Sequence, residues 1–111
     1  MATILRGEIW WAELDPVHGH EQGGTRPVLI ISDRDFNTRS GTVIVMAITS
    51  QEPKAGFPLT YDLGAENLPK HSWVKISQIR TLAVQRLTSK LSEIDREIVD
   101  EIVNGLQQIV G

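Results

Sequence analysis

Near its start, this chain runs from a polar, glycine-rich stretch directly into four aliphatic residues. Residues 19–27 read Gly-His-Glu-Gln-Gly-Gly-Thr-Arg-Pro, and Val-Leu-Ile-Ile follows at 28–31. An apolar run bounded by turn residues predicts a buried strand. Pro27 has no amide hydrogen for a β-ladder, so we expect it to be the first residue of that strand, which reaches Ser32. Arg26 is then placed between a loop and a rigid sheet, where a phosphate-binding cation is well positioned.

Other apolar segments predict that the fold is mainly β. Residues 42–49 are almost all apolar, which is typical of a strand covered on both faces, whereas 72–79 alternate as in a strand with one buried face. Asp33 is a candidate cap for a short helical turn that reaches Ser40. Further strands are expected at 8–14, 59–63 (an edge strand) and 86–91. Six or seven short strands favour a small, strongly curved β-barrel.

The C-terminal segment has the apolar spacing of an amphipathic helix. We expect this helix to start at Ser92, with Asp95 three residues later as a capping-box-like partner. Burying its aliphatic stripe would cap the barrel or join two copies of the chain. The stripe comprises Ile94, Ile98, Val99, Ile102, Val103, Leu106, Ile109 and Val110.

Length and composition narrow the class of protein. A chain of 111 residues predicts a single domain that spans residues 1–111. The absence of cysteine excludes a disulfide framework and a thiolate metal site. No apolar run approaches the length of a membrane span, and the first six residues lack the layout of a signal peptide. We therefore expect a cytoplasmic protein that has no contact with a membrane.

The negative net charge of −3 is concentrated at one end of the chain. Residues 1–90 carry ten Lys and Arg against nine Asp and Glu, a net charge of +1. Residues 91–111 carry one Arg against five Asp and Glu, a net charge of −4. The body of the protein can therefore hold a local basic groove, but it has no long basic patch for strong non-specific binding to duplex nucleic acid.

A series of short motifs resembles the MazF/PemK (Kid) family of toxin–antitoxin growth inhibitors, and the motifs occur in family order along nearly the whole chain. They are Arg6-Gly7-Glu8-Ile9-Trp10, Leu14-Asp15-Pro16, Gly19-His20-Glu21-Gln22, Thr25-Arg26-Pro27-Val28-Leu29-Ile30, Phe36-Asn37, Ile48-Thr49-Ser50, Gln78-Ile79-Arg80-Thr81, Gln85-Arg86-Leu87 and Lys90-Leu91-Ser92.

The resemblance implies a small SH3-like barrel of the type shared by the CcdB and MazF toxins, usually a homodimer. It implies an endoribonuclease that needs no metal or other cofactor and cuts single-stranded RNA at short sequence motifs. It also implies a cognate antitoxin with a disordered acidic tail that blocks the RNA groove. The positions that one branch fills with Arg and Asp are Lys75 and Ser77 here, so residues 78–81 resemble the MazF branch more closely.

The resemblance assigns catalytic roles to Arg26, Thr49 and His20. RNA can be cut without a metal because its own 2′-hydroxyl is a nucleophile. A guanidinium suits the charge that develops on the phosphorane, and a hydroxyl at the end of a strand can donate to a phosphate oxygen. Without the resemblance, a surface arginine paired with Glu21 or Asp15 and an ordinary strand threonine remain the alternatives.

The residues that would transfer protons are the least clearly identified by the sequence. His20 has a suitable intrinsic pKa for acid–base work, and Glu21 next to it can act as the base or orient Arg26. A solvated loop histidine is the alternative for His20. A metal site at His18 and His20 is disfavoured, because no third ligand is near them in the sequence.

Further polar and aromatic residues are candidates for RNA contacts, although each alone is more often a solvated side chain. Adjacent Trp10 and Trp11 must point to opposite faces of a strand. We expect Trp10 in the core and Trp11 on a groove or partner surface, and Trp73 can stack on an unpaired base. The polar candidates are Ser50, Gln51, Lys75, Ser77, Gln78, Arg80 and Arg86.

Two alternatives to a ribonuclease stay open on this fold. One is a non-catalytic toxin resembling CcdB, which poisons DNA gyrase through a tryptophan-containing C-terminus, but this chain ends Gln108-Ile109-Val110-Gly111. The other is a barrel that binds RNA or protein and has lost activity. The joint presence of Arg26, Thr49 and His20 argues against the second alternative.

Overall fold

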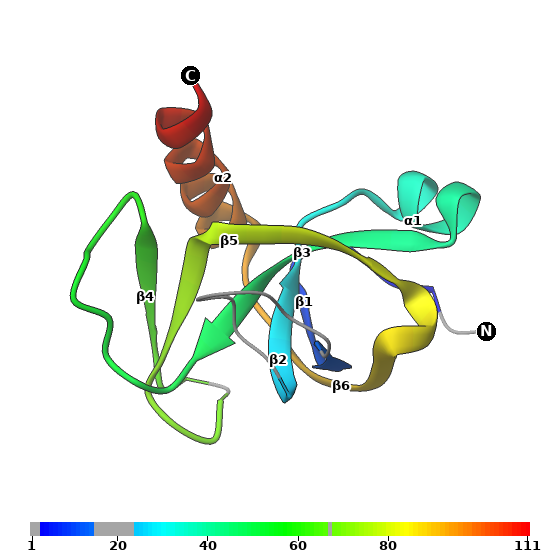
Figure 1. Ribbon diagram of the computed structural model, residues 1–111, viewed down its shortest axis with the longest axis horizontal. Coiled ribbons are helices and arrows are strands. Elements are labelled where there is room, and N and C mark those ends of the chain that lie inside the picture. The colour runs from blue at the N-terminus through cyan, green and yellow to red at the C-terminus, as the bar shows by residue number, and fades with distance from the viewer. Residues whose placement is uncertain (1–2, 15–23, 67) are drawn as a thin grey trace.

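The computed structural model describes residues 3–14, 24–66 and 68–111. Six strands, two α-helices and one short 3-10 helix follow one another along this part of the chain (Figure 1). In order they are β1 (Glu8–Glu13), β2 (Thr25–Ile30), α1 (Arg34–Ser40), β3 (Thr42–Thr49), β4 (Thr60–Gly64), β5 (Ser72–Ala83), the 3-10 helix η1 (Val84–Arg86), β6 (Leu87–Glu93) and α2 (Arg96–Val110).

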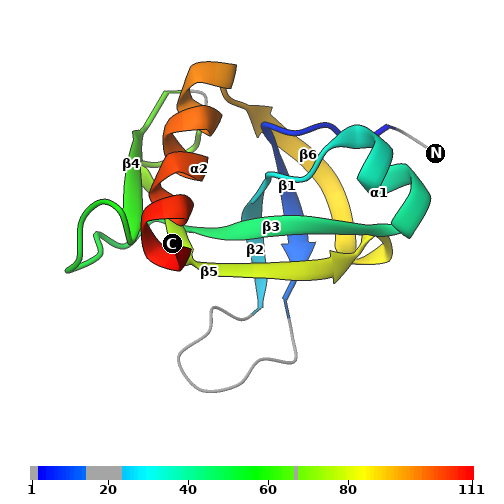
Figure 2. The same ribbon diagram turned by 90° about the horizontal axis from the view of Figure 1, so that it is seen from above.

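The six strands form one antiparallel sheet in the order β4-β5-β3-β2-β1-β6. The sheet curls strongly, and α2 crosses it at one end while α1 lies at the other (Figure 2). The mainly β fold with a C-terminal helix is confirmed. Because β4 and β6 are the two ends of the strand order, the described strands make an open barrel rather than a closed one.

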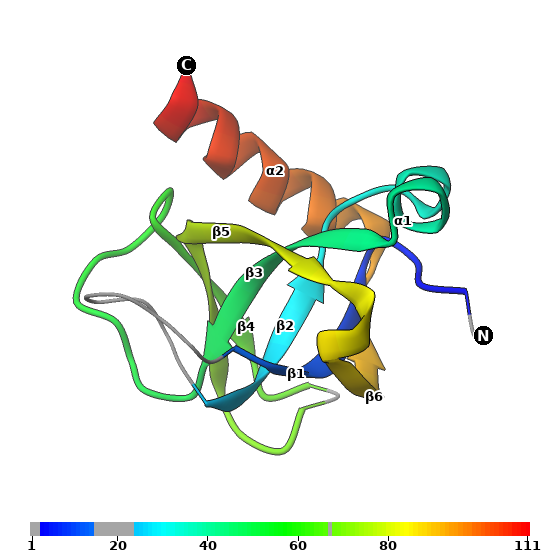
Figure 3. The same ribbon diagram turned by 45° about the vertical axis from the view of Figure 1, so that its right-hand side comes forward.

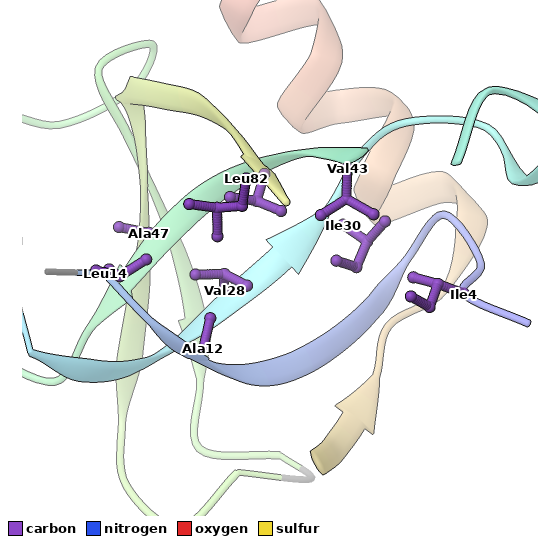
Figure 4. Close-up of a cluster of buried hydrophobic side chains, with 9 residues drawn as sticks. Ile4, Ala12, Leu14, Val28, Ile30, Val43, Ala47 and Leu82 are labelled. Atoms are coloured by element: carbon purple, nitrogen blue, oxygen red, sulfur yellow. The ribbon is translucent and has the colours of Figure 1, made fainter. Parts of the chain in front are cut away.

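Both faces of the sheet are covered by apolar side chains. The concave face encloses a cluster of nine buried residues, eight of which are labelled in Figure 4. On the convex face a second cluster of buried residues includes Ile102 of α2. Strand β3 contributes to both clusters, which explains why its sequence is almost continuously apolar.

Most of the expected strands are present, and the limits of several differ. Strand β3 has the predicted bounds, and β4 is an edge strand as expected. Strand β2 begins at Thr25, so the prediction that Pro27 is its first residue is wrong. Pro27 lies opposite Trp11 of β1, and pairing with β3 starts only at Val28, so the missing amide hydrogen interrupts no described pairing with β3.

The predicted start of the C-terminal helix is also wrong. Ser92 lies in β6, where it is opposite Ile9, and α2 begins at Arg96. Asp95 occupies the N-cap position, and its side chain makes no capping hydrogen bond. Neither described helix is long and apolar enough to cross a membrane.

Helix α1 closes one end of the barrel. Asp33 caps it as expected, because its side chain accepts a hydrogen bond from the Asp35 N–H. The buried side chain of Asn37 donates to the Ile4 carbonyl and is bonded to the Ser32 hydroxyl. This network ties α1 to the N-terminal segment, at the end of the sheet away from Arg26.

Candidate active site

Arg26 and Thr49 lie on neighbouring strands and face the same side of the sheet. Arg26 pairs with Ala12 of β1, and by alternation its side chain shares the concave face with Val28. The pairing of β2 with β3 begins at Val28, which is opposite Ala47, and Thr49 follows Ala47 by two residues just as Arg26 precedes Val28 by two. The two principal candidates from the sequence therefore lie at the adjoining ends of β2 and β3.

Thr49 is the last residue of β3, and it is only 5% exposed. Its Oγ1 accepts a hydrogen bond from the Gln51 backbone N–H at 3.2 Å. A hydroxyl that accepts one bond still has its own hydrogen to donate. The turn through Ser50 thus orients the Thr49 hydroxyl, while Ser50 and Gln51 themselves stay exposed.

Two more arginines converge on the end of β1. Arg80 of β5 donates from Nη1 to the Leu14 carbonyl at 3.4 Å, and Arg86 of η1 donates from Nη1 to the Glu13 carbonyl at 3.2 Å. Arg26 pairs through its backbone with Ala12, so three arginines lie near the end of β1. This concentration of positive charge suits a ligand with several phosphates.

An irregularity in the pairing of β5 lies beside this cluster. Met46 is opposite Ile79, whereas Ile48 is opposite Val74, so residues 75–78 of β5 face the single residue Ala47. Such bulges bend a strand and redirect its side chains, and they are common next to active sites. Gln78 lies within this bulge, and its side chain is half-buried.

Lys75 and Ser77 lie on the side of β5 that faces β4. Lys75 pairs with Thr60, and the Ser77 N–H donates to the Leu59 carbonyl. These backbone contacts place both residues beside the connection to β4. Their role in RNA binding stays a prediction.

Trp10 and Trp11 divide between the two faces as expected. Trp10 packs against the concave cluster, and its Nε1 donates to Glu8 Oε1 at 3.0 Å. Trp11 lines a pocket of about 200 Å³ together with Arg26, Ser50 and Leu91. The pocket combines an aromatic ring with a cation and a hydroxyl, which is a suitable lining for a nucleotide.

The candidate acid–base residues His20 and Glu21 lie outside the described residues, as does the His18–His20 pair. The Thr25 hydroxyl donates to Glu13 Oε2 at 3.1 Å where the chain returns to the sheet. This contact and the Leu14 N–H bond to the Gly24 carbonyl close the base of segment 15–23. Within the described part of the chain, no three His, Cys, Asp or Glu side chains gather as a metal site.

The sequence did not indicate the surroundings of Trp73. His71 stacks on the Trp73 ring with the ring centroids 4.2 Å apart, and His71 Nε2 lies 2.6 Å from Asp62 Oδ1. The Gly64 N–H and His71 both lower the pKa of Asp62 below its ordinary value. His71 is exposed, and only the pairing of β4 with β5 reveals its partners.

Comparison with known proteins places the chain in a family. Residues 5–110 match the model of the family described as PemK-like, MazF-like toxins of type II toxin–antitoxin systems. The chain belongs to this family. It is 42% identical over 106 residues to the endoribonuclease EndoA of Bacillus subtilis, a match that covers 94% of this chain and 91% of that protein.

Solved structures of the family share the fold. MazF from Deinococcus radiodurans superposes with a TM-score of 0.88 and 27% identity, over 100% of this chain and 99% of that one. A MazE–MazF structure from the same organism gives a TM-score of 0.81 and 26% identity, over 100% and 98% of the two chains. The family resemblance in the sequence motifs is thereby confirmed.

Proposed function

We propose that this MazF-like chain is a metal-independent endoribonuclease toxin that cleaves single-stranded RNA at short sequence motifs. The observation that supports the proposal is that β2 and β3 are paired neighbours, with Arg26 and Thr49 at their adjoining ends. The relationship to EndoA, which is named an endoribonuclease, supports the same reaction. The proposed protein is a single domain that acts in the cytoplasm, where messenger RNA is accessible.

In the proposed reaction, the 2′-hydroxyl oxygen attacks the adjacent phosphorus, and the bond from phosphorus to the 5′-oxygen breaks. The products are a 2′,3′-cyclic phosphate and a 5′-hydroxyl end. Arg26 stabilises the charge on the phosphorane through bidentate hydrogen bonds, and the Thr49 hydroxyl donates to a phosphate oxygen. A base removes the proton of the 2′-hydroxyl, and an acid protonates the leaving oxygen.

His20 and Glu21 are the proposed proton-transfer residues. Arginine is always protonated in proteins, so Arg26 is a poor choice for the base. The described residues on either side of segment 15–23, Leu14 and Gly24, are joined by a backbone hydrogen bond of 2.9 Å. His20 and Glu21 come shortly before Arg26 in the sequence, which supports their assignment.

The remaining candidates are proposed to bind RNA on either side of the scissile phosphate. Arg80 and Arg86 provide positive charge beside the end of β1. Ser50, Gln51 and Gln78 offer groups that can read a base edge. Lys75 and Ser77 extend this set along β5 toward β4.

The test is to incubate the purified protein with long single-stranded RNA in excess EDTA and to map the product ends. We expect discrete cuts within one short motif, with 5′-hydroxyl ends. Gyrase inhibition in a supercoiling assay, with no RNA cleavage, would favour the gyrase-poison alternative. Saturable RNA binding without any cut product would favour an inactive barrel.

The proposed partners are a cognate antitoxin and a second copy of the chain. MazF from D. radiodurans has been solved with MazE, and we propose a corresponding antitoxin here. Large apolar side chains are exposed at the end of α2, in the connection between β3 and β4 and on β5, and we propose that they form one apolar face. We define this apolar face by Phe57, Leu59, Ile79, Ile109 and Val110.

Ile79→Asp is expected to convert a dimer into a monomer, because a carboxylate buried in an apolar interface has no partner to compensate its desolvation. Sedimentation of the parent protein should give twice the monomer mass of 12.4 kDa. Phe36→Asp is the matched control, because Phe36 is similarly exposed but lies on α1. A parent protein that sediments as a monomer, or equal effects of the two substitutions, would contradict the proposed interface.

A further inference from the structure

Two contacts join α2 to the connection between β3 and β4, which passes below α2 in Figure 3: one comes from the loop, residues 50–59, and one from Tyr61 in β4. The Tyr61 hydroxyl of β4 donates to Glu101 Oε2 of α2. The Phe57 ring lies over Gly105, which is four residues after Glu101 and therefore on the same side of the helix. The Phe57 and Tyr61 rings also meet edge to face, with centroids 6.4 Å apart. We call Phe57, Tyr61, Glu101 and Gly105 the loop–helix latch.

The backbone conformation of Gly105 does not require glycine. Its φ is not in the left-handed region, and glycine inside a helix costs about 1 kcal/mol relative to alanine. The reason is space, because a Cβ at this position would lie 2.8 Å from Phe57 Cε2 and 3.0 Å from Ile76 Cδ1. The missing side chain makes the seat for the Phe57 ring.

The second contact of the latch is the hydrogen bond from the Tyr61 hydroxyl to Glu101. Glu101 as the acceptor, with burial as a smaller cause, raises the pKa of Tyr61 to about 12. The phenol is therefore protonated at neutral pH and can donate to the carboxylate. The bond joins β4 to α2 beside β5, where Figure 2 shows the helix lying next to β4.

The other end of the same loop is at the candidate active site. The loop starts at Ser50 and Gln51, directly after Thr49, and Thr60 fixes its far end by donating to the Ala55 carbonyl at 2.7 Å. Between the loop and strands β4 and β5 lies a cavity of about 460 Å³, lined by loop residues and by Tyr61, Asp62 and Trp73. Because this space separates the loop from the sheet, contacts at its ends and at α2 set its position.

We propose that Tyr61 and Gly105 are positioning residues for RNA cleavage. By holding the loop on α2, they fix where Ser50 and Gln51 lie beside Arg26 and Thr49. This inference rests on the proposed ribonuclease function. It adds a role for α2, which the sequence alone indicated only as a cap on the barrel or a dimer element.

The test compares two disruptive variants with two matched controls. Glu101→Ala removes the acceptor, and Gly105→Ala puts a methyl group into the Phe57 seat. Glu101→Gln keeps an acceptor oxygen for Tyr61. Gly56→Ala makes the same glycine change in the loop itself, where a Cβ meets nothing within 4 Å. All variants are first checked for folding by circular dichroism and for oligomeric state by sedimentation.

The first readout needs no activity. Amide hydrogens of residues 51–59 are expected to exchange about tenfold faster in Glu101→Ala and Gly105→Ala than in the parent, with α2 amides unchanged. The second readout is kinetic. Both variants should raise KM for a long RNA about tenfold with little change in kcat, and should cleave a dinucleotide that spans only the scissile bond at the parental rate.

The outcomes separate this inference from the proposed function. Cleavage by the parent together with parental exchange and KM in both disruptive variants would overturn the latch and leave the ribonuclease intact. Equal losses on long RNA and on the dinucleotide, or an effect of Glu101→Gln as large as that of Glu101→Ala, would also overturn it. Absence of any RNA cleavage by the parent would overturn the proposed function and this inference with it.

Discussion

Arg26→Ala is expected to lower the rate of RNA cleavage by about 10²–10³-fold, the usual cost of removing one donor that stabilises a transition-state charge. Arg26 lies in β2, opposite Ala12 of β1, at the open end of the concave face. It is not part of the buried cluster, so its replacement leaves that cluster intact. Arg80 and Arg86 are bonded to carbonyl groups of Leu14 and Glu13, so they cannot take its place without breaking those contacts. Single-turnover cleavage of one mapped site measures the effect.

One further variant separates the shape of the Arg26 side chain from its charge, and a second one is a control for the loss of an exposed arginine. Arg26→Lys keeps the charge and loses the planar, bidentate donor, so we expect it to stay strongly impaired. Arg39→Ala removes an exposed arginine in the last turn of α1 and should cleave at the parental rate. Full activity in Arg26→Ala, with its fold intact by circular dichroism, would remove Arg26 from the mechanism.

Strands are well predicted from the sequence where at least one of their faces is buried. The predicted bounds of β3, residues 42–49, are correct because each face of that strand packs into an apolar cluster, which makes its sequence almost continuously apolar. The start of α2 was predicted too early because Ser92 and Asp95 have the spacing of a capping box. Tertiary pairing decides instead, since Ser92 is opposite Ile9 and the Ile94 N–H donates to the Gly7 carbonyl.

The candidate site was only partly visible in the sequence. Family motifs pointed to Arg26 and Thr49, but neither residue stands out by local pattern alone. The convergence of Arg80 and Arg86 on the end of β1 depends on contacts across 66 and 73 residues. The bulge over residues 75–78 of β5 has no glycine or proline to mark it. These features arise from the closure of the sheet rather than from local sequence preference.

The carboxylate of Glu8 in β1 is buried in the sheet and is stabilised there by hydrogen bonds and an ion pair. The Glu8 residue is 6% exposed, and its Oε1 accepts hydrogen bonds from the Leu5 N–H and from Trp10 Nε1, both at 3.0 Å. Its Oε2 lies 3.3 Å from Lys90 Nζ of β6. Burial on its own raises the pKa of Glu8, but the hydrogen bonds from Leu5, Trp10 and Lys90 outweigh it, so the pKa is lowered from the ordinary value of 4.5.

Glu8→Gln is therefore expected to reduce the free energy of unfolding by about 1–3 kcal/mol at pH 7, the usual size of hydrogen bonds to a charged group. A carboxylate with a lowered pKa in the folded state contributes stability above the unfolded value of about 4.5, and loses it as the pH falls through the folded pKa. The difference in the free energy of unfolding between parent and variant should thus shrink in urea titrations below pH 4.5.

Glu93→Gln is the matched control, because Glu93 pairs with the same lysine at 3.4 Å but is 72% exposed, and exposed pairs contribute about 0–1 kcal/mol. Equal losses in the two variants, or a loss in Glu8→Gln that does not change with pH, would show that the buried carboxylate adds nothing beyond a surface ion pair.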